Sequence, residues 1–458
     1  MIKMKVFNTM KRGKEELISG KKLKFFVCGP TVYDYSHIGH ARTYVSFDVI
    51  VKYLRHRGIN VFYLQNITDI DDKIINRAKE NNIDPMTMAR EFAEEYFKDM
   101  KELGVDSVDK YAFATEYVQA IIKQVQNLIY KGFAYKLEDG IYFDLSKFED
   151  YGKLSGKKEI GEEDAVSRID DSVNKKNKGD FCLWKVSKEG EPSWDSPFGK
   201  GRPGWHIEDT AITETEFGPQ YDVHGGARDL IFPHHEAEIA QMEASSGKIP
   251  FVRYWLHTGF LNVNGQKMSK SLGNFITIRD ALKKYGKRVL RLFFLSTHYR
   301  SPIDFSDESV EAIKKSLERI DNFIDSMRDV NGEGEISGRI NDFKDKFEES
   351  MNDDFNTPEA LSVLFDFIRD VNRMRDQGLV NKETGEKIIE QMFEFNRFLG
   401  IMKEDTEEIS DEIKKLVEKR EDARKNKDFE TSDKIRDELK EKGYCVEDSP
   451  SGPRCKKI

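Results

Sequence analysis

Residues 23–43 read LKFFVCGPTVYDYSHIGHART and carry the strongest local signals in the N-terminal part of the chain. The apolar run over residues 23–28 has the length of a buried strand, and Gly29-Pro30 indicates the turn that ends it. His37 and His40 lie beyond this turn, three residues apart. A thiol at the end of a strand and two imidazoles in the next turn mark a candidate site.

A helix and a second strand come next. Apolar residues recur at helical spacing over residues 41–57, and Gly58 indicates the end of that helix. Residues 60–68 predict another strand. Strand, loop, helix and strand of this length form a βαβ unit, which predicts a parallel sheet. Ligands bind at the carboxyl ends of such strands, where Cys28 and the two histidines lie.

The composition favours a globular protein of several domains. The chain has 458 residues, of which 38% are hydrophobic and 34% charged. The N-terminus has no apolar signal region and no run is long enough for a membrane helix, so we expect a cytoplasmic protein with no membrane partner. The four cysteines are too scattered for a disulfide framework. The net charge of −9 does not indicate a nucleic-acid binder, although a local basic patch would suffice for one.

The middle of the chain interrupts the predicted sheet. Residues 109–201 carry charged, irregular stretches, and the strand pattern resumes at residues 221–226. We therefore expect an α/β fold in which a Rossmann-type, parallel-sheet catalytic domain is formed by residues 1–108 and 202–260. Residues 109–201 would be an insertion between its two halves.

The last third is predicted to be helical. Residues 310, 313, 317, 320 and 324 follow the spacing of one buried helix face, and a second stripe runs from Leu361 to Val371. We expect a signature-loop and stem-contact region at 261–306, a helical bundle at 307–400 and a small C-terminal module at 401–458. That module begins with charged helices and ends in a hairpin.

Two short signatures narrow the function. The first is His37-Ile38-Gly39-His40, and the second is Lys267-Met268-Ser269-Lys270-Ser271, about 230 residues later in a glycine-flanked loop. Either alone is a weak signal, but the ordered pair resembles the class I aminoacyl-tRNA synthetases. The stretches TDIDDKI, GRPGWHIE and HGGARDLIFPHHEAEIAQ extend the resemblance to the cysteinyl-tRNA synthetase family over nearly the whole chain.

The resemblance implies amino-acid activation by ATP with Mg²⁺, an in-line attack of a carboxylate on the α-phosphorus. Such a reaction needs positioning and charge neutralisation. Imidazoles at a helix N-terminus suit it, because the helix dipole favours anions there. The resemblance assigns catalysis to His37, His40, Lys267 and Lys270. It assigns ATP and adenylate binding to Gly29, Thr31, Gly39, Gly226, Asp229, Met268, Ser269 and Ser271.

An enzyme specific for cysteine must distinguish the thiol of its substrate from the hydroxyl of serine. An apolar pocket separates cysteine from serine by only about 1–3 kcal/mol, whereas zinc favours soft sulfur. The resemblance places cysteine against Cys28, Thr68 and Trp205, and one Zn²⁺ on Cys28, Asp209, His234 and Glu238. Asp209 stands where many relatives have a second cysteine, which makes the site harder and other divalent ions more competitive. A metal-free pocket and a loosely held ion remain alternatives.

The C-terminal module resembles an anticodon reader, with Arg424, Phe429, Asp433 and Asp448 at matching positions. An aromatic ring can stack on a splayed base, and carboxylates can accept hydrogen bonds from base edges. The implied partners are tRNA(Cys), L-cysteine and ATP, with the ester formed on the terminal adenosine by a monomeric enzyme.

Three other functions share parts of this pattern. A ligase that joins activated cysteine to an amino sugar would use the same adenylation core, but such relatives lack an anticodon reader. A nucleotidyltransferase of the superfamily would not need Cys28, Trp205, His234 and Glu238 together. A catalytically inactive RNA-binding paralogue would not need both signatures intact.

Overall fold

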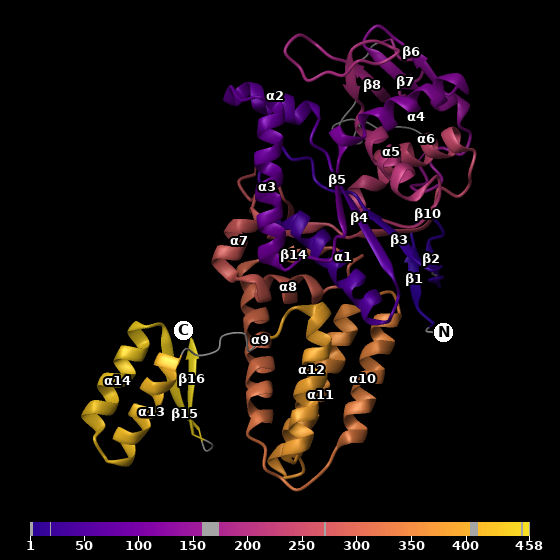
Figure 1. Cartoon of the computed structure of the whole chain (residues 1–458). Coiled ribbons are helices and arrows are strands. Elements are labelled where there is room, and N and C mark those ends of the chain that lie inside the picture. Colours follow the sequence, from indigo (N-terminus) through magenta and orange to yellow (C-terminus); the bar gives the residue numbers. More distant parts are fainter. Residues whose placement is uncertain are drawn as a thin grey trace.

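The two halves of the predicted sheet join into one. The computed structural model describes residues 3–18, 20–157, 174–269, 272–403, 411–449 and 452–457. At its centre lies a five-stranded parallel sheet in the order β11-β10-β3-β4-β5 (Figure 1). The strands are β3 (Leu23–Val27), β4 (Val61–Ile67), β5 (Lys110–Phe113), β10 (Tyr221–Ala227) and β11 (Val252–Thr258). The predicted parallel α/β sheet is confirmed.

Helix α1 (Ile38–His56) connects β3 to β4 and is almost entirely buried. It begins three residues before the predicted start, because the His37 ring caps the first-turn amides. It ends where Gly58 adopts a φ of 76°, as the sequence predicted. The sheet order reverses between β3 and β10, so the site at the end of β3 lies at the switch point.

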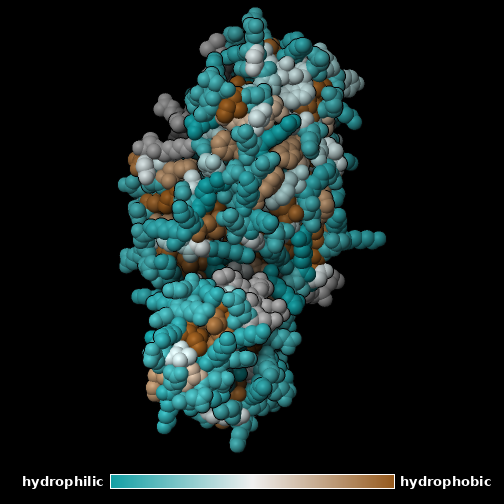
Figure 2. All heavy atoms as spheres, turned by 60° about the vertical axis from the view of Figure 1, so that its left-hand side comes forward, coloured by the Kyte–Doolittle hydropathy of each residue, from teal (hydrophilic) through white to brown (hydrophobic). Residues whose placement is uncertain are grey.

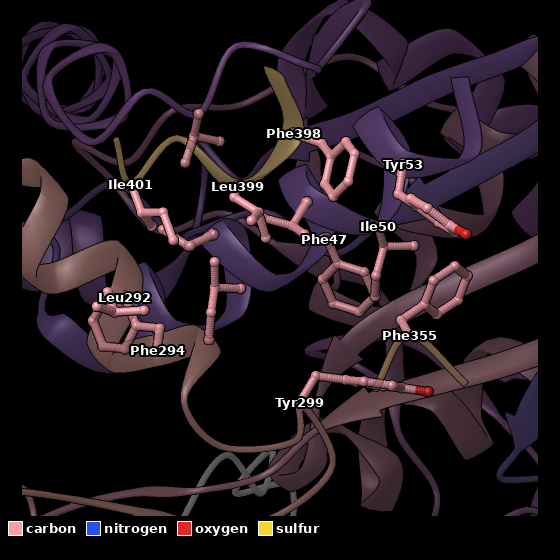
Figure 3. Packing of buried hydrophobic residues seen from close by; sticks show 14 of the residues in the cluster. Phe47, Ile50, Tyr53, Leu292, Phe294, Tyr299, Phe355, Phe398, Leu399 and Ile401 are labelled. Carbon is pink, nitrogen blue, oxygen red and sulfur yellow. The ribbon is translucent and has the colours of Figure 1, made fainter. Parts of the chain in front are cut away.

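The main core packs α1 against two later helices. Figure 3 shows side chains of α1 converging on those of α8 (Lys287–Leu295) and on the end of α12 (Lys382–Leu399). The labelled residues are Phe47, Ile50, Tyr53, Leu292, Phe294, Tyr299, Phe355, Phe398, Leu399 and Ile401. This contact joins the N-terminal sheet to the C-terminal helices in one hydrophobic core.

The middle of the chain is more regular than the sequence indicated. Helices α2 (Asp72–Asn81) and α3 (Pro85–Leu103) precede β5. Next come η1 (Ala114–Tyr117) and α4 (Val118–Tyr130). They are followed by an antiparallel sheet of four strands, which are β6 (Ala134–Lys136), β7 (Gly140–Phe143), β8 (Cys182–Val186) and β9 (Gly201–Pro203). The short helix η2 (Leu145–Lys147) follows β7. Helices α5 (Trp205–Phe217) and α6 (Glu236–Ser246) flank β10, with η3 (Arg228–Leu230) and η4 (Ile231–His235) between.

The later part of the chain is helical, as predicted. Helices α9 (Asp307–Arg328), α10 (Ser337–Asn352), α11 (Thr357–Asp376) and α12 form a bundle below the sheet (Figure 1). A small unit of α13 (Asp411–Lys425), α14 (Phe429–Glu441), β15 (Tyr444–Ser449) and β16 (Gly452–Lys457) comes last. Short strands complete the fold. Strand β1 (Lys5–Asn8) pairs with β2 (Gly13–Glu16). Strand β12 (Leu261–Val263) lies between β13 (Gln266–Lys267), which precedes α7 (Ile278–Tyr285), and β14 (Ile303–Phe305), which follows that helix.

The face in Figure 2 is mainly hydrophilic, with hydrophobic residues in small separate patches. Among the described residues, no helix combines the length and the apolar character that crossing a membrane requires.

Asp354 ties the first strand to the bundle. Its buried carboxylate accepts hydrogen bonds from the Phe7 N–H at 2.8 Å, the Tyr299 hydroxyl at 2.8 Å and Arg300 Nε at 2.7 Å. His298 Nε2 lies 3.4 Å from the same carboxylate. Burial lowers the pKa of His298 to about 4, and the Asp354 carboxylate only partly offsets this effect.

We expect His298→Gln to flatten the pH dependence of stability below neutrality. An unfolded histidine binds a proton below about pH 6.5, whereas folded His298 binds one only below about pH 4. The unfolded state therefore binds more protons between these values, and wild-type stability falls by at most about 3 kcal/mol as the pH drops. Thermal unfolding midpoints between pH 4 and 8 measure this slope, and parallel curves for the two proteins would contradict the assignment.

Candidate active site

The histidine turn opens helix α1 at the end of β3. The rings of His37 and His40 stack with centroids 3.8 Å apart and planes 17° apart. His37 Nδ1 accepts from the N–H groups of Gly39 (3.1 Å) and His40 (3.3 Å), and His40 Nδ1 accepts from the His37 N–H (3.4 Å). Burial lowers the pKa of His40 well below its usual value, and His37 and Lys73 lower it further. His40 is therefore a neutral imidazole at pH 7.

The second signature returns to this turn. The Ile38 N–H donates to the Ile276 carbonyl at 3.1 Å, and the Ile278 N–H donates to the Ser36 carbonyl at 2.9 Å. The Phe275 ring lies edge-on to His37 with centroids 5.4 Å apart. The structure thus brings the loop that follows Lys267 onto the histidines. Lys270 and Ser271, two of the predicted site residues, lie outside the described residues.

The near side of this loop also reaches the turn. A Cβ added at Gly39 would lie 2.8 Å from the His37 ring and 3.7 Å from Met268 Cε, so glycine is the residue that fits there. The Ser269 N–H donates to Asn274 Oδ1 at 2.8 Å. Lys267 is exposed at the end of the β12–β13 hairpin.

The remaining predicted nucleotide residues line the ends of β3 and β10. A Cβ on Gly29 would lie 1.7 Å from the Asn66 carbonyl oxygen, which shows how closely β3 and β4 approach each other here. Thr31 pairs with Thr68 in an isolated bridge. Gly226 is the penultimate residue of β10, and Asp229 is exposed in the 3₁₀ turn that follows the strand.

Cys28 lies in a buried pocket of imidazoles and carboxylates. Its Sγ is 3.2 Å from His224 Nε2, 3.3 Å from His235 Nε2 and 4.0 Å from Glu238 Oε1. His234 Nε2 in turn lies 2.9 Å from Glu238 Oε1 and 3.0 Å from Asp209 Oδ2. The structure therefore brings together all four residues of the predicted metal set, from the residue after β3 and from α5, η4 and α6.

The compact donor group differs from the predicted set by one member. Ligand atoms of Cys28, His234, His235 and Glu238 all lie within 4.8 Å of one another. Asp209, which the sequence placed in the set, contacts His234 through its Oδ2 but is not a member of the compact group. Asp209 Oδ1 and Glu238 Oε2 are buried without a hydrogen-bond partner, and a divalent ion would satisfy both. Thiolate, imidazole and carboxylate donors fit zinc.

The charges of this pocket also favour a cation. Burial raises the pKa of the Cys28 thiol, and the Glu238 and Asp209 carboxylates raise it further. Burial raises the pKa of Glu238 to about 8, although His234 opposes this effect. The carboxylates outweigh burial at His234 and raise its pKa to about 9. A metal ion would displace these protons and bind in their place.

Helix α5 supplies one wall of the pocket. The Trp205 and His234 rings stack with centroids 4.1 Å apart and planes 16° apart. One turn further along, the Glu208 carboxylate accepts a hydrogen bond from the Thr68 hydroxyl at 2.9 Å. Thr68 and Trp205, the predicted cysteine-binding residues, thus lie on the same pocket as Cys28.

Two pairs of contacts that involve histidines lie behind the thiol and were not predicted from the sequence. The Tyr221 hydroxyl lies 2.6 Å from His224 Nδ1, and His235 Nδ1 lies 2.9 Å from His257 Nε2. The signals were present, since His235 is the second residue of a histidine pair and His224 lies in the strand of the HGG stretch. The pairing of β10 with β3 brings His224 to Cys28, and η4, which follows β10, brings His235 to the same sulfur.

The predicted anticodon residues lie on the small C-terminal unit. Phe429 begins α14 with 64% of its surface exposed, and Arg424 is exposed near the end of α13. Asp433 forms an ion pair with Arg436 at 3.3 Å, and Asp448 lies on β15. Three of these positions lie on or near the helix hairpin, well separated in sequence from the catalytic site.

Family models cover most of the chain. The model of the class I (C) tRNA synthetase catalytic domain matches residues 14–315, and that of the DALR domain matches residues 346–403. The cysteinyl-tRNA ligase anticodon-binding domain matches residues 406–453. Solved structures share the fold: methionyl-tRNA synthetase from Mycobacterium tuberculosis in complex with methionyl-adenylate aligns with a TM-score of 0.61 at 16% identity, over 83% of this chain and 90% of that one.

A second solved structure also shares the fold. The ternary complex of Agrobacterium radiobacter LeuRS with tRNA and LeuAMS aligns with a TM-score of 0.62 at 11% identity, over 84% of each chain. Among curated proteins, the cysteine-tRNA ligase of Carboxydothermus hydrogenoformans is 46% identical over 99% of this chain and 100% of its own length. That of Methanococcus maripaludis is 48% identical over 99% of both chains. The chain belongs to the cysteinyl-tRNA synthetase family of class I aminoacyl-tRNA synthetases.

Proposed function

We propose that this chain activates L-cysteine with ATP and transfers the cysteinyl group to the 3′ adenosine of tRNA(Cys), releasing AMP and pyrophosphate. One observation carries the proposal. The histidine turn and the Lys267 loop meet at the end of β3, next to a buried pocket that holds Cys28, His234 and Glu238. A phosphate-facing turn and a thiol-selective pocket therefore adjoin each other, as formation of a cysteinyl-adenylate requires.

The first step joins the cysteine carboxylate to the α-phosphorus. A carboxylate oxygen forms the new bond to phosphorus, and the bond from that phosphorus to the bridging oxygen breaks as pyrophosphate leaves. His37 and His40 stabilise the charge that builds on the phosphate oxygens, and Lys267 and Lys270 neutralise the departing pyrophosphate with Mg²⁺. In the second step a ribose hydroxyl of the terminal adenosine attacks the carbonyl carbon and AMP leaves.

The ATP and adenylate site would combine backbone approach with polar side chains. Gly29, Gly39 and Gly226 are assigned to this site, and glycine fits at each position because a Cβ there would meet a neighbouring group of the protein. Asp229 would accept from the ribose hydroxyls. The other residues assigned to this site are Thr31, Met268, Ser269 and Ser271.

The amino-acid site would use one zinc ion with Cys28, Asp209, His234 and Glu238. When bound, zinc supplies a soft cation that prefers a substrate thiolate to a hydroxyl. The proximity of His235 to Cys28 makes it a competing ligand. Thr68 and Trp205 would hold the rest of the substrate, with the Trp205 ring covering His234.

The tRNA would be bound by the later domains. We assign residues 1–108 and 202–260, together with β5 of the central sheet, to the catalytic domain, the rest of 109–201 to an acceptor-end insertion and 261–306 to the signature loop and stem contacts. A bundle at 307–400 would carry the anticodon module at 401–458, where Arg424, Phe429, Asp433 and Asp448 read the bases. We further propose a cytoplasmic monomer, because the described cysteines are free thiols and one chain supplies every part of the site.

Cysteine-dependent exchange of pyrophosphate into ATP, followed by charging of tRNA(Cys), tests this function. Exchange with cysteine but not serine, together with esterification of the tRNA, is the expected result. The match to an anticodon-binding domain disfavours the ligase that acts on an amino sugar. Exchange without any transfer to tRNA, with transfer to an amino sugar instead, would establish that alternative.

Phe429→Ala is expected to separate the two steps. Loss of stacking on one base corresponds to roughly a 10- to 100-fold lower kcat/KM for tRNA charging. Pyrophosphate exchange should not change, because the catalytic turn lies in a different domain. Glu430→Ala, the exposed neighbour on the same helix, is the matched control. Equal charging by both variants would remove Phe429 from the interface.

A further inference from the structure

The structure holds a buried carboxylate that neither the adenylation site nor the metal group uses. Glu208 lies in the first turn of α5 and has no exposed surface. Its Oε2 accepts from the Thr68 hydroxyl at 2.9 Å, and its Oε1 has no hydrogen-bond partner. A buried polar group without a partner is unfavourable, and at a functional site it points to a missing ligand.

Such oxygens concentrate in this pocket. Among the described residues, the buried carboxylate oxygens without a partner belong to Asp99, Glu208, Asp209 and Glu238. Asp209 and Glu238 both contact His234, so the proposed metal ion would account for their free oxygens. Glu208 is instead hydrogen-bonded to Thr68, so its free oxygen calls for a different partner.

Helix geometry places this carboxylate beside the thiol site. Glu208 and Asp209 follow Trp205 by three and four residues, so each side chain is a neighbour of the Trp205 ring on α5. Trp205 stacks on His234 and Asp209 contacts the same ring, while Glu208 reaches Thr68 just after β4. A molecule bound through sulfur at Cys28 and His234 would therefore have Glu208 at its flank.

A positively charged group would suit this free oxygen. Glu208 is a buried carboxylate, and Asp209, Asp71 and Asp69 are buried carboxylates as well. Cysteine carries an α-ammonium group three bonds from its sulfur. This is the one positive group that the substrate itself would bring into the pocket.

We propose that Glu208 accepts a hydrogen bond from the α-ammonium group of the substrate cysteine and, with Thr68, is a specificity-determining residue for an amino acid over a simple thiol. The inference rests on the proposed function.

Glu208→Gln tests the proposal, because it keeps the shape and removes the charge. The probes are L-cysteine and 3-mercaptopropionate, which has the thiol and carboxylate but no ammonium. We expect the KM for cysteine in pyrophosphate exchange to rise about 10- to 100-fold, as for the loss of a hydrogen bond to a charged group. The inhibition constant of 3-mercaptopropionate should stay within about threefold. Equal shifts for both compounds, or none for either, would overturn the proposal.

Two further variants separate this effect from a structural one. Glu214→Gln lies on the same helix, where Glu214 accepts from Gln124 at 2.8 Å, and it should leave both constants unchanged. If Glu208→Gln does not fold, Glu208→Asp keeps the charge but withdraws it by one methylene, and it should raise the KM for cysteine alone. A wild-type protein without cysteine-dependent exchange would refute the proposed function. A wild-type protein with exchange, whose Glu208 variants keep the same preference for cysteine, would refute only this inference.

Discussion

His40→Asn is expected to lower the kcat of cysteine-dependent pyrophosphate exchange about 100- to 1,000-fold. Asparagine Oδ1 occupies the place of the imidazole Nδ1, so it can still accept from the His37 N–H and preserve the helix start. The substitution removes the Nε2–H donor of the neutral His40 ring at the helix N-terminus. Removing one preorganised donor from a site of developing negative charge has an effect of this size.

The measurement needs a control for folding and for substrate binding. His56→Asn lies at the other end of the same helix, where the ring is partly buried beside Glu394, and it should change kcat little. The KM for cysteine should change only a few-fold in His40→Asn, because the thiol pocket is a separate cluster. A kcat within about fivefold of wild type would remove His40 from the catalytic group.

The catalytic half of the fold could be predicted because its signals are local. Residues 23–28 and 60–68 are continuous apolar strands, and the helix between them has a clear period. The structure places these elements at Leu23–Val27, Val61–Ile67 and Ile38–His56. The helix start was missed by three residues because the cap is an imidazole, and the usual cap signal is Ser, Thr, Asp or Asn.

The insertion could not be predicted in the same way. Its strands have three to five residues each, and β7 pairs with β8 across about 40 residues of intervening chain. Short strands whose partners are distant in sequence leave little periodicity to detect. This is why residues 109–201 read as irregular although their described parts contain an ordered antiparallel sheet.

In the candidate site, too, the contacts between residues close in sequence could be predicted and those between distant residues could not. His234 and Glu238 are four residues apart, and the structure places their side chains 2.9 Å from each other, as helical spacing predicts. The closeness of His224 and His235 to Cys28 depends on the pairing of β10 with β3, which the sequence does not contain as a pattern. Glu208 was missed because burial, and not residue type, makes it unusual.

Cys28→Ala is expected to abolish metal retention and amino-acid selection together. Protein purified without a chelator should hold close to one equivalent of zinc in the wild type and less than about a tenth in the variant, since the only thiolate among the described residues of the pocket is gone. The preference for cysteine over serine should fall to the roughly 10- to 200-fold that an apolar pocket provides. Cys182→Ala removes another buried thiol, in β8, and should retain both properties.

Asp209→Cys is the complementary test, because it adds a thiolate where this chain has a carboxylate. Asp209 already contacts His234 at 3.0 Å and carries a buried oxygen without a partner, so a sulfur ligand at this position would be near the same ion. Soft ligands favour zinc over harder divalent ions, so competition with a chromogenic chelator should show zinc held at least about tenfold more tightly, with less displacement by Mn²⁺. Equal affinity in both proteins would mean that residue 209 does not ligate the ion and that His235 completes the group. A wild-type protein that holds less than about a tenth of an equivalent of any transition metal and still rejects serine would show that the carboxylates and imidazoles select the thiol without a metal.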